Sequence, residues 1–364
     1  MSIVLTEQIA YKALQNFFQQ KPFVLFGTGT SCAVDTSFGM DALKNYLLSE
    51  VPKNSLAGSQ QGQWDCVVDN LINGSDLESA MNDVQDENLT KIIIGSTATF
   101  VAGLDREYGV KIVLGDTDWP ALTLFERLVV GLPETDRVLH VATPNYDLLA
   151  EYAFEKAGIP YITGFTGGII RRMDWKQAKR SMTYDEYSSG RNGKHMRKNK
   201  KHIRLYKVHG SLNTFGMDCA IVENNAWIYD TAKLERIMIT PGTAKYERLH
   251  KYRPELLGEH DLAVEKHDAF LFIGFGFNDS QLTNNAIKRK LKEQKCHGLI
   301  ITRDSNPRIE AYLEECENLW LVCRNPDGGC NGSRIFNSRY QDWLLINDKQ
   351  LWDASVFTKE ILGG

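Results

Sequence analysis

Four short apolar runs, each ended by a turn of glycine or small polar residues, constrain the fold of this chain most strongly. The runs and their turns read KPFVLFGTGTSC (21–32), RVLHVATPNYD (137–147), IRLYKVHGS (203–211) and AFLFIGFGFND (269–279). Apolar runs of this length between turn signals predict buried strands. The second run is followed by a helical pattern at 146–158 and by the short run PYITGF, and such a β-α-β unit implies parallel strands.

Helical periodicity dominates the chain between the first two runs. DALKNYLLSEV, DLESAMNDV and PALTLFERLVVGL place apolar residues at i, i+3 and i+4. We therefore expect an α/β fold, with a Rossmann-like, mostly parallel sheet and a helical insertion. The expected parts are a core of 1–41 and 135–330, a helical insertion of 42–134 and a C-terminal extension of 331–364. Further strands are expected at ERIMITPG, GLIITRD and LWLVCRNPD.

Charge and cysteine content exclude several classes of protein. The formal net charge of -4 argues against overall attraction to nucleic acid or to an anionic membrane. The seven cysteines form no C-x-x-C pair, which fits scattered reduced thiols better than a disulfide framework. No apolar run approaches the roughly 18 residues that span a bilayer, and no basic leader opens the sequence. We expect a cytoplasmic protein with no membrane contact.

The turns after the strands carry the groups that are able to do chemistry. In a doubly wound sheet, ligands bind beyond the carboxyl ends of the strands. GTGTS (27–31), TPNYD (143–147), VHGS (208–211) and GFGFND (274–279) should therefore meet at one site. Glycine lets backbone approach a ligand closely, and the imidazole of His209 can accept a proton near neutral pH. His140, inside its strand, is expected to belong to the core.

Each of these residues also has a structural interpretation. Ser31, Asp147 and Asp279 are residue types that cap helices, and a helical pattern follows each of them. Asn145 suits a turn, and an isolated His209 would be interpreted as a satisfied histidine at a sheet end. The presence of all four motifs favours the functional interpretation of His209, whereas the two interpretations of Asp147 are evenly matched.

In this order and spacing, the four motifs resemble those of the sirtuins. GTGTS resembles the sirtuin turn Gly-Ala-Gly-x-Ser, TPNYD resembles Thr-Gln-Asn-x-Asp, and VHGS matches the catalytic His-Gly. GFGFND is similar to the glycine-rich turn of bacterial sirtuin-like defence proteins. The resemblance covers 1–41 and 135–325, and it implies NAD as the substrate and Asn145 and His209 as catalytic residues. The residues implied to bind NAD are Gly27, Thr28, Gly29, Thr30, Ser31, Asp147, Gly274, Phe275, Gly276, Asn278, Asp279 and Thr302.

The resemblance also assigns parts of NAD to these positions. The first turn would approach the pyrophosphate, to which Ser31 would donate a hydrogen bond. Asn145 would position a water and the nicotinamide ribose, and Asp147 would orient the nicotinamide amide. Residues 274–279 would line the adenosine side, and Thr302 would contact a ribose.

Departures from the sirtuin pattern bear on the reaction. Sirtuin deacylases hold a structural zinc with two C-x-x-C pairs, which this sequence lacks, so no metal is implied. The sirtuin Pro-Asp-Phe-Arg is also missing, since the chain reads CAVDTSFGMDAL after the first turn. These differences favour an NAD glycohydrolase that releases nicotinamide and ADP-ribose, with water as the acceptor. The alternatives are a protein deacylase or ADP-ribosyltransferase, and a non-catalytic sensor of NAD or ADP-ribose that gates a partner.

Partners are expected from two sources. The resemblance implies antiphage defence, a homo-oligomer and a HerA-type ATPase partner. Separately, residues 171–207 contain 13 Lys or Arg and three acids, a local balance of +10. We expect an exposed loop at 190–204 that contacts nucleic acid or an acidic partner, the alternative being a solvated loop.

Overall fold

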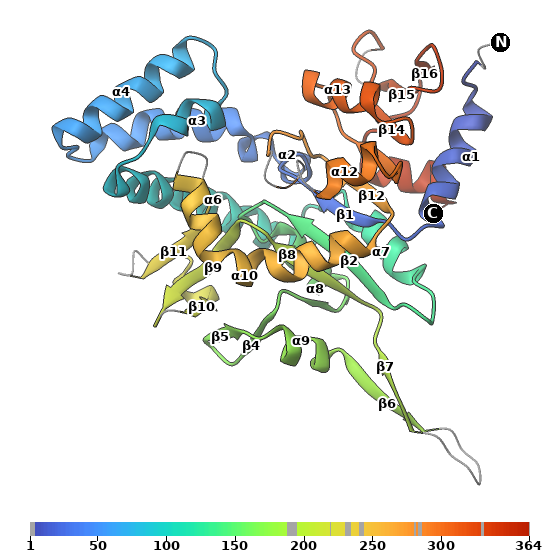
Figure 1. Cartoon of the computed structure of the whole chain (residues 1–364), viewed down its shortest axis with the longest axis horizontal. Coiled ribbons are helices and arrows are strands. Elements are labelled where there is room, and N and C mark those ends of the chain that lie inside the picture. The colour runs from blue at the N-terminus through green and yellow to red at the C-terminus, as the bar shows by residue number, and fades with distance from the viewer. Residues whose placement is uncertain are drawn as a thin grey trace.

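A nine-stranded sheet runs through the centre of the protein (Figure 1). The computed structural model describes residues 4–187, 195–218, 220–229, 234–239, 244–279, 282, 286–328 and 331–363. The strand order is β16-β15-β14-β13-β12-β1-β2-β8-β3. Their bounds are β1 Phe23–Phe26, β2 Val138–Thr143, β3 Tyr161–Ile162, β8 His202–Lys207, β12 Ala269–Ile273, β13 His297–Ile301, β14 Leu319–Arg324, β15 Ser333–Asn337 and β16 Leu344–Ile346.

The sheet is parallel from β14 to β3 and antiparallel only at β15 and β16. The fold is therefore α/β and Rossmann-like, as the sequence predicted. The expected β-α-β unit is present, although β8 lies between β2 and β3 in the sheet. The two antiparallel strands come from 331–364, so the segment expected as a C-terminal extension adds to the central sheet.

Helices cover both faces of this sheet, which explains why its strands are uninterrupted apolar runs. Val24 and Phe26 of β1 pack with residues of helices on one face, and Phe23 and Leu25 pack with residues of other helices on the opposite face. The first face is covered by α1 Glu7–Phe18, α7 Leu122–Val130, α8 Leu149–Lys156 and α14 Ala354–Phe357. The second is covered by α10 Ala244–Lys266, α12 Ala286–Lys292 and α13 Pro307–Glu315.

Helices also fill most of the chain between β1 and β2 (Figure 1). These are α2 Gly29–Cys32, α3 Met40–Glu50, α4 Gly58–Ile72, α5 Leu77–Ala80, α6 Glu87–Leu114 and α7. Helices α3 to α6 enclose a core of their own around Trp64, whereas α7 packs on the central sheet. Within the described ranges, no helix is both long and apolar enough to cross a bilayer.

A smaller antiparallel sheet lies beside the central one, in the order β11-β9-β10-β5-β4. Its strands are β4 Phe165–Gly167, β5 Arg171–Met173, β9 Gly210–Met217, β10 Ala220–Glu223 and β11 Glu235–Met238. The strand expected at 235–242 is β11. Strand β9 follows β8 after only two residues, so the chain passes from one sheet to the other at His209.

The basic segment corrects one expectation. We expected an exposed loop at 190–204, but β7 (His195–Asn199) pairs with β6 (Thr183–Tyr187) in a hairpin that projects from the molecule (Figure 1). The segment then enters β8 of the central sheet, and its residues 190–194 lie outside the described residues. Arg197 lies 3.3 Å from Asp185, and Lys198 lies 2.5 Å from Glu186. Asp185 and Glu186 are two of the three acids already counted in the local balance of +10, so these pairs engage Arg197 and Lys198 without changing that balance.

Candidate active site

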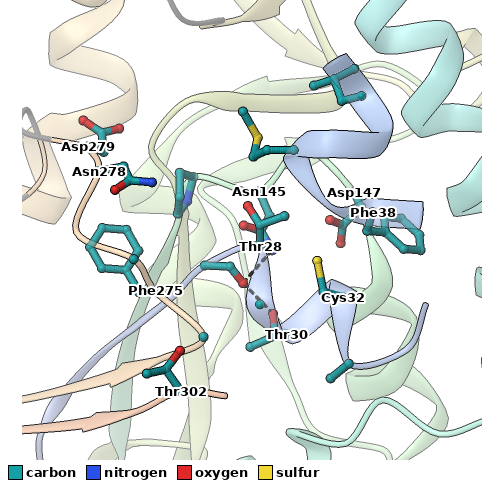
Figure 2. Close-up of a pocket in the computed structure, with 18 of the residues that line it drawn as sticks. Thr28, Thr30, Cys32, Phe38, Asn145, Asp147, Phe275, Asn278, Asp279 and Thr302 are labelled. Atoms are coloured by element: carbon teal, nitrogen blue, oxygen red, sulfur yellow. Dashed lines mark hydrogen bonds between the residues drawn. The ribbon is translucent and has the colours of Figure 1, made fainter. Parts of the chain in front are cut away.

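A cavity of about 720 Å³ opens at the carboxyl ends of the parallel strands (Figure 2). Its volume is in the range of small-molecule and cofactor sites. The turns after β1, β2, β8 and β12 all reach it, as does the residue after β13. It is lined by all but one of the residues that the sequence singled out: Gly27, Thr28, Gly29, Thr30, Asn145, Asp147, His209, Gly274, Phe275, Gly276, Asn278, Asp279 and Thr302. Figure 2 shows Asn278 and Asp279 at one side of this space and Asn145 and Asp147 toward the other.

The glycine turns after β1 and β12 abut one another. The backbone N–H of Gly29 donates to the carbonyl oxygen of Gly274 at 2.9 Å. A Cβ at Gly29 would lie 2.6 Å from the Cα of Gly274, and one at Gly27 would lie 2.8 Å from its carbonyl oxygen. Backbone at such distances leaves no room for a side chain. The glycines are therefore needed for the contact between the two turns that form the cavity floor.

Ser31 is the one predicted residue that does not line the cavity. It is buried, and its hydroxyl donates to Oδ2 of Asp147 at 2.8 Å. The same hydroxyl accepts a hydrogen bond from Nδ2 of Asn145 at 3.1 Å. Ser31 thus joins the two polar side chains that follow β2, and its contact with the pyrophosphate stays a prediction.

Asn145 presents an oxygen without a partner. Its Nδ2 donates to the carbonyl oxygen of Gly27 at 3.1 Å as well as to Ser31, so both amide protons are used. Its Oδ1 is buried and has no hydrogen-bond partner among the described residues. Leaving a buried acceptor unpaired costs about 1–3 kcal/mol. Because Asn145 lines the cavity, this oxygen is a ready acceptor for a ligand hydroxyl or a water.

Asp147 lies at the start of α8 and also lines the cavity, and its contact with the nicotinamide amide stays a prediction. Its Oδ1 accepts a hydrogen bond from the backbone N–H of Leu149 at 3.3 Å, at the start of α8. Its Oδ2 accepts the Ser31 hydroxyl, and the side chain lines the cavity. The helix start therefore fixes a carboxylate at the wall of the site.

His209 is held at the junction of the two sheets. Its backbone oxygen accepts from the N–H of Ile239 at 2.9 Å, and the side chain is buried. Gly210 has a φ of 73°, and a Cβ there would lie 1.8 Å from the carbonyl oxygen of Ile237. Only glycine fits this left-handed position. The imidazole Nε2 lies 2.8 Å from Oδ2 of Asp279, which follows β12.

A comparison with protein families identifies this arrangement. The model of the SIR2-like domain matches residues 139–321, from β2 to β14. The chain belongs to the SIR2-like domain family. The match includes Asn145, Asp147, His209, the turn at 274–279 and Thr302, whereas the first turn at 27–31 precedes it. SIR2-like domains bind NAD, so membership is consistent with an NAD-utilising enzyme. No curated protein matches the chain.

A buried ionic network lies behind the SIR2-like site, and sequence reasoning did not find it. Nζ of Lys207 donates to the backbone oxygen of Asp147 at 2.6 Å and lies 2.9 Å from Glu151 of α8. Burial raises the pKa of Glu151, which Lys207 opposes. Asp105 of α6 accepts from the N–H of Leu148 at 2.6 Å, and burial raises its pKa to about 7. Both contacts hold the peptide group between Asp147 and Leu148.

Two walls of the SIR2-like cavity come from segments outside the four motifs. The helices before β2 contribute apolar side chains and two acids, and the C-terminal segment contributes a short stretch before and into α14. They include Met40, Leu43, Leu47, Asp76, Leu77, Glu78, Met81 and Val101 from the helices, and Trp352, Asp353 and Ala354 from the C-terminal segment. No turn or charge pattern marks these positions in the sequence.

Two ion pairs lie at the end of the cavity near Thr302. Nε of Arg303 lies 2.9 Å from Asp304, which also lies 2.6 Å from Arg324. Arg303 is the one Lys or Arg side chain among the described lining residues. The described ranges contain no group of three or more His, Cys, Asp and Glu side chains that could hold a metal ion.

Proposed function

We propose that this SIR2-like protein is an NAD glycohydrolase that cleaves NAD to nicotinamide and ADP-ribose, with water as the acceptor. One observation carries the proposal: the unpaired Oδ1 of Asn145 and the imidazole of His209 line one cavity at the carboxyl ends of the parallel strands. A protein that only binds NAD needs no such pair of an acceptor and a base. Family membership supports NAD as the substrate.

The chemistry suits the groups that are present. Nicotinamide leaves as a neutral molecule because it begins as a cationic pyridinium, so the leaving group needs no general acid. This differs from ordinary glycoside hydrolysis, in which a carboxylic acid protonates the leaving oxygen. Oδ1 of Asn145 would accept a hydrogen bond from the attacking water or a ribose hydroxyl, and His209 would accept the proton.

The charges of the cavity support one orientation of NAD. Asp279 lies beside His209, and Glu78 and Asp147 also line the cavity. These carboxylates favour the cationic nicotinamide and the oxocarbenium-like centre that forms when it departs. Arg303 lies with Thr302 after β13, where it favours the pyrophosphate and adenosine side. The nicotinamide ribose would therefore face Asn145 and His209.

The biological setting is part of the same proposal. The resemblance of the four motifs to bacterial sirtuin-like defence proteins supports a role in antiphage defence by abortive infection. In such a role, the loss of NAD would stop the infected cell from producing phage. A homo-oligomer and a HerA-type ATPase partner follow from that resemblance, whereas a cytoplasmic location is suggested by the unpaired spacing of the cysteines. Sedimentation of the purified protein, alone and with such an ATPase, tests the two assembly states.

The test of the reaction compares turnover with and without an acceptor. Purified protein is incubated with NAD, alone or with an acyl-lysine peptide, and nicotinamide and ADP-ribose are quantified by mass spectrometry. We expect equal amounts of both products without peptide. We also expect a fall of at least about 100-fold for Asn145→Ala and for His209→Ala, in keeping with the usual contribution of general base catalysis.

An acceptor other than water would change which conditions release nicotinamide. Nicotinamide release that depends on the acyl-lysine peptide would contradict hydrolysis and indicate a deacylase. NAD that binds but stays intact, with and without the ATPase partner, would indicate a sensor.

A further inference from the structure

Asp279 and His209 contact each other beyond the carboxyl ends of the strands of the central sheet. His209 follows β8 and Asp279 follows β12, and two strands, β1 and β2, lie between these in the sheet. Nε2 of His209 is nevertheless 2.8 Å from Oδ2 of Asp279, and the two side chains are only 7% and 9% exposed. The turn after β12 must therefore reach over its neighbours to bring a carboxylate to the imidazole. Sequence reasoning had placed Asp279 on the adenosine side of NAD or at a helix cap.

The turn that carries Asp279 is held in a strained conformation. Phe277, two residues earlier, has a φ of 58°, which is rare for a residue with a bulky side chain. Its buried ring packs against Phe272 and Tyr312, with ring centroids 4.7 and 4.8 Å away. Strain of this kind persists only where the surrounding packing imposes it, and it is common at functional sites.

Residues at the start of α13 hold the same turn from the other side. Nδ2 of Asn306 donates to the carbonyl oxygen of Gly276 at 3.0 Å, and Arg308 donates to that of Asn278 at 2.9 Å. The position of Asp279 is thus fixed by contacts that are independent of His209.

We propose that Asp279 is a positioning residue for His209 in the NAD cleavage proposed above, on which this inference rests. Nε2 lies 2.8 Å from the carboxylate, although it makes no aligned hydrogen bond among the described residues. A carboxylate at this distance favours the tautomer whose N–H is on Nε2, and that tautomer leaves the lone pair of Nδ1 as the proton acceptor. When water attacks, its oxygen bonds to the ribose carbon, the bonding pair departs with the nicotinamide nitrogen, and the proton passes to Nδ1. The imidazolium that forms is then stabilised by the carboxylate.

Other charged groups near His209 are engaged elsewhere or lie on other walls. Lys207, on the same strand, is directed to the backbone of Asp147 and to Glu151. Asp147 is held by the Ser31 hydroxyl and the start of α8. Glu78 lines the cavity from α5. Asp279 is the carboxylate whose oxygen lies at hydrogen-bonding distance from the imidazole.

The kinetic test uses Asp279→Asn, which keeps the shape of the side chain and removes its charge. We expect kcat for NAD cleavage to fall about 10–100-fold, a typical loss for a group that orients a catalytic histidine, while KM stays within about twofold. Asp136→Asn is the matched control, because Asp136 is an exposed carboxylate paired with Lys21. An unchanged kcat with a raised KM would overturn the proposal and make Asp279 a group that binds substrate.

A spectroscopic test does not depend on turnover. A ring N–H proton held by a buried carboxylate exchanges slowly and gives a resolved signal at the far downfield end of the proton NMR spectrum. We expect such a signal in the full-length protein, assigned by its loss in His209→Gln, and we expect Asp279→Ala to abolish it as well. Its absence from the wild-type protein, or its survival in Asp279→Ala, would overturn the proposal. If the wild type does not cleave NAD, the proposed reaction fails, and the positioning contact is decided by this signal alone.

Discussion

Ser31 lies behind the cavity wall, where its hydroxyl links the side chains of Asn145 and Asp147. Each of these side chains is polar, buried and part of the candidate site. A hydroxyl in this place orients both of them without touching a ligand in the cavity. We therefore expect Ser31 to fix the direction in which Oδ1 of Asn145 points.

This role predicts a separation of kcat from KM. Ser31→Ala removes one of the two acceptors of the Asn145 amide, so we expect kcat for NAD cleavage to fall about tenfold, close to the ~1.4 kcal/mol of one hydrogen bond. KM should stay within about twofold. Ser49→Ala is the matched control, since Ser49 is exposed on α3 and its hydroxyl donates to the backbone oxygen of Tyr46. A raised KM with normal kcat would instead support direct contact of Ser31 with the pyrophosphate.

Helix α6 connects the helical segment to the site. It begins at the cap residue Asp86, whose carboxylate accepts from the N–H of Leu89 at 2.8 Å, and ends at Gly115 in the left-handed conformation. Along its 28 residues it contributes to three separate apolar clusters and carries Asp105 to the loop before α8. A single helix thus joins the core around Trp64, the central sheet and the site.

Two glycines within α6 should respond oppositely to alanine. At Gly103 an added Cβ would meet nothing within 4 Å, so Gly103→Ala should raise the free energy of unfolding by about 0.5–1 kcal/mol. At Gly109 an added Cβ would lie 2.4 Å from the ring of Tyr152, so Gly109→Ala should lower the free energy of unfolding by about 1–3 kcal/mol. Urea denaturation of both variants tests the pair. Equal effects would contradict the contact between α6 and α8.

At the scale of the whole molecule, the sequence predicted the strands and turns that have a local pattern, and it missed the contacts between segments that are distant in the chain. The strands of the parallel sheet could be predicted because burial on both faces requires continuous apolar runs. Their turns could be predicted because glycine is needed where two backbone segments contact each other. Strand β9, GSLNTFGM, was missed because it is rich in small polar residues and has no clear alternation. Strand β15 pairs with β14 only after a turn, and no local pattern shows that it joins the sheet.

The candidate site also has a part that the sequence predicted and a part that it did not. All but one of the residues predicted from the four motifs line one cavity, because the carboxyl ends of parallel strands share an edge. The walls formed by Met81 and Trp352 could not be predicted, because they depend on how the helical and C-terminal segments pack. The partnership of Asp279 with His209 depends on the path of one strained turn, which sequence spacing does not reveal.

The most direct test is the structure of the complex with a non-cleavable carbocyclic NAD. The cavity should hold the analogue with its nicotinamide ribose within hydrogen-bonding reach of Oδ1 of Asn145 and of His209, ~2.6–3.2 Å directly or through one water. The adenosine should lie near Thr302. An analogue bound in the reverse orientation, or an empty cavity at concentrations that saturate binding in solution, would contradict the assignment of this cavity as the site of NAD cleavage.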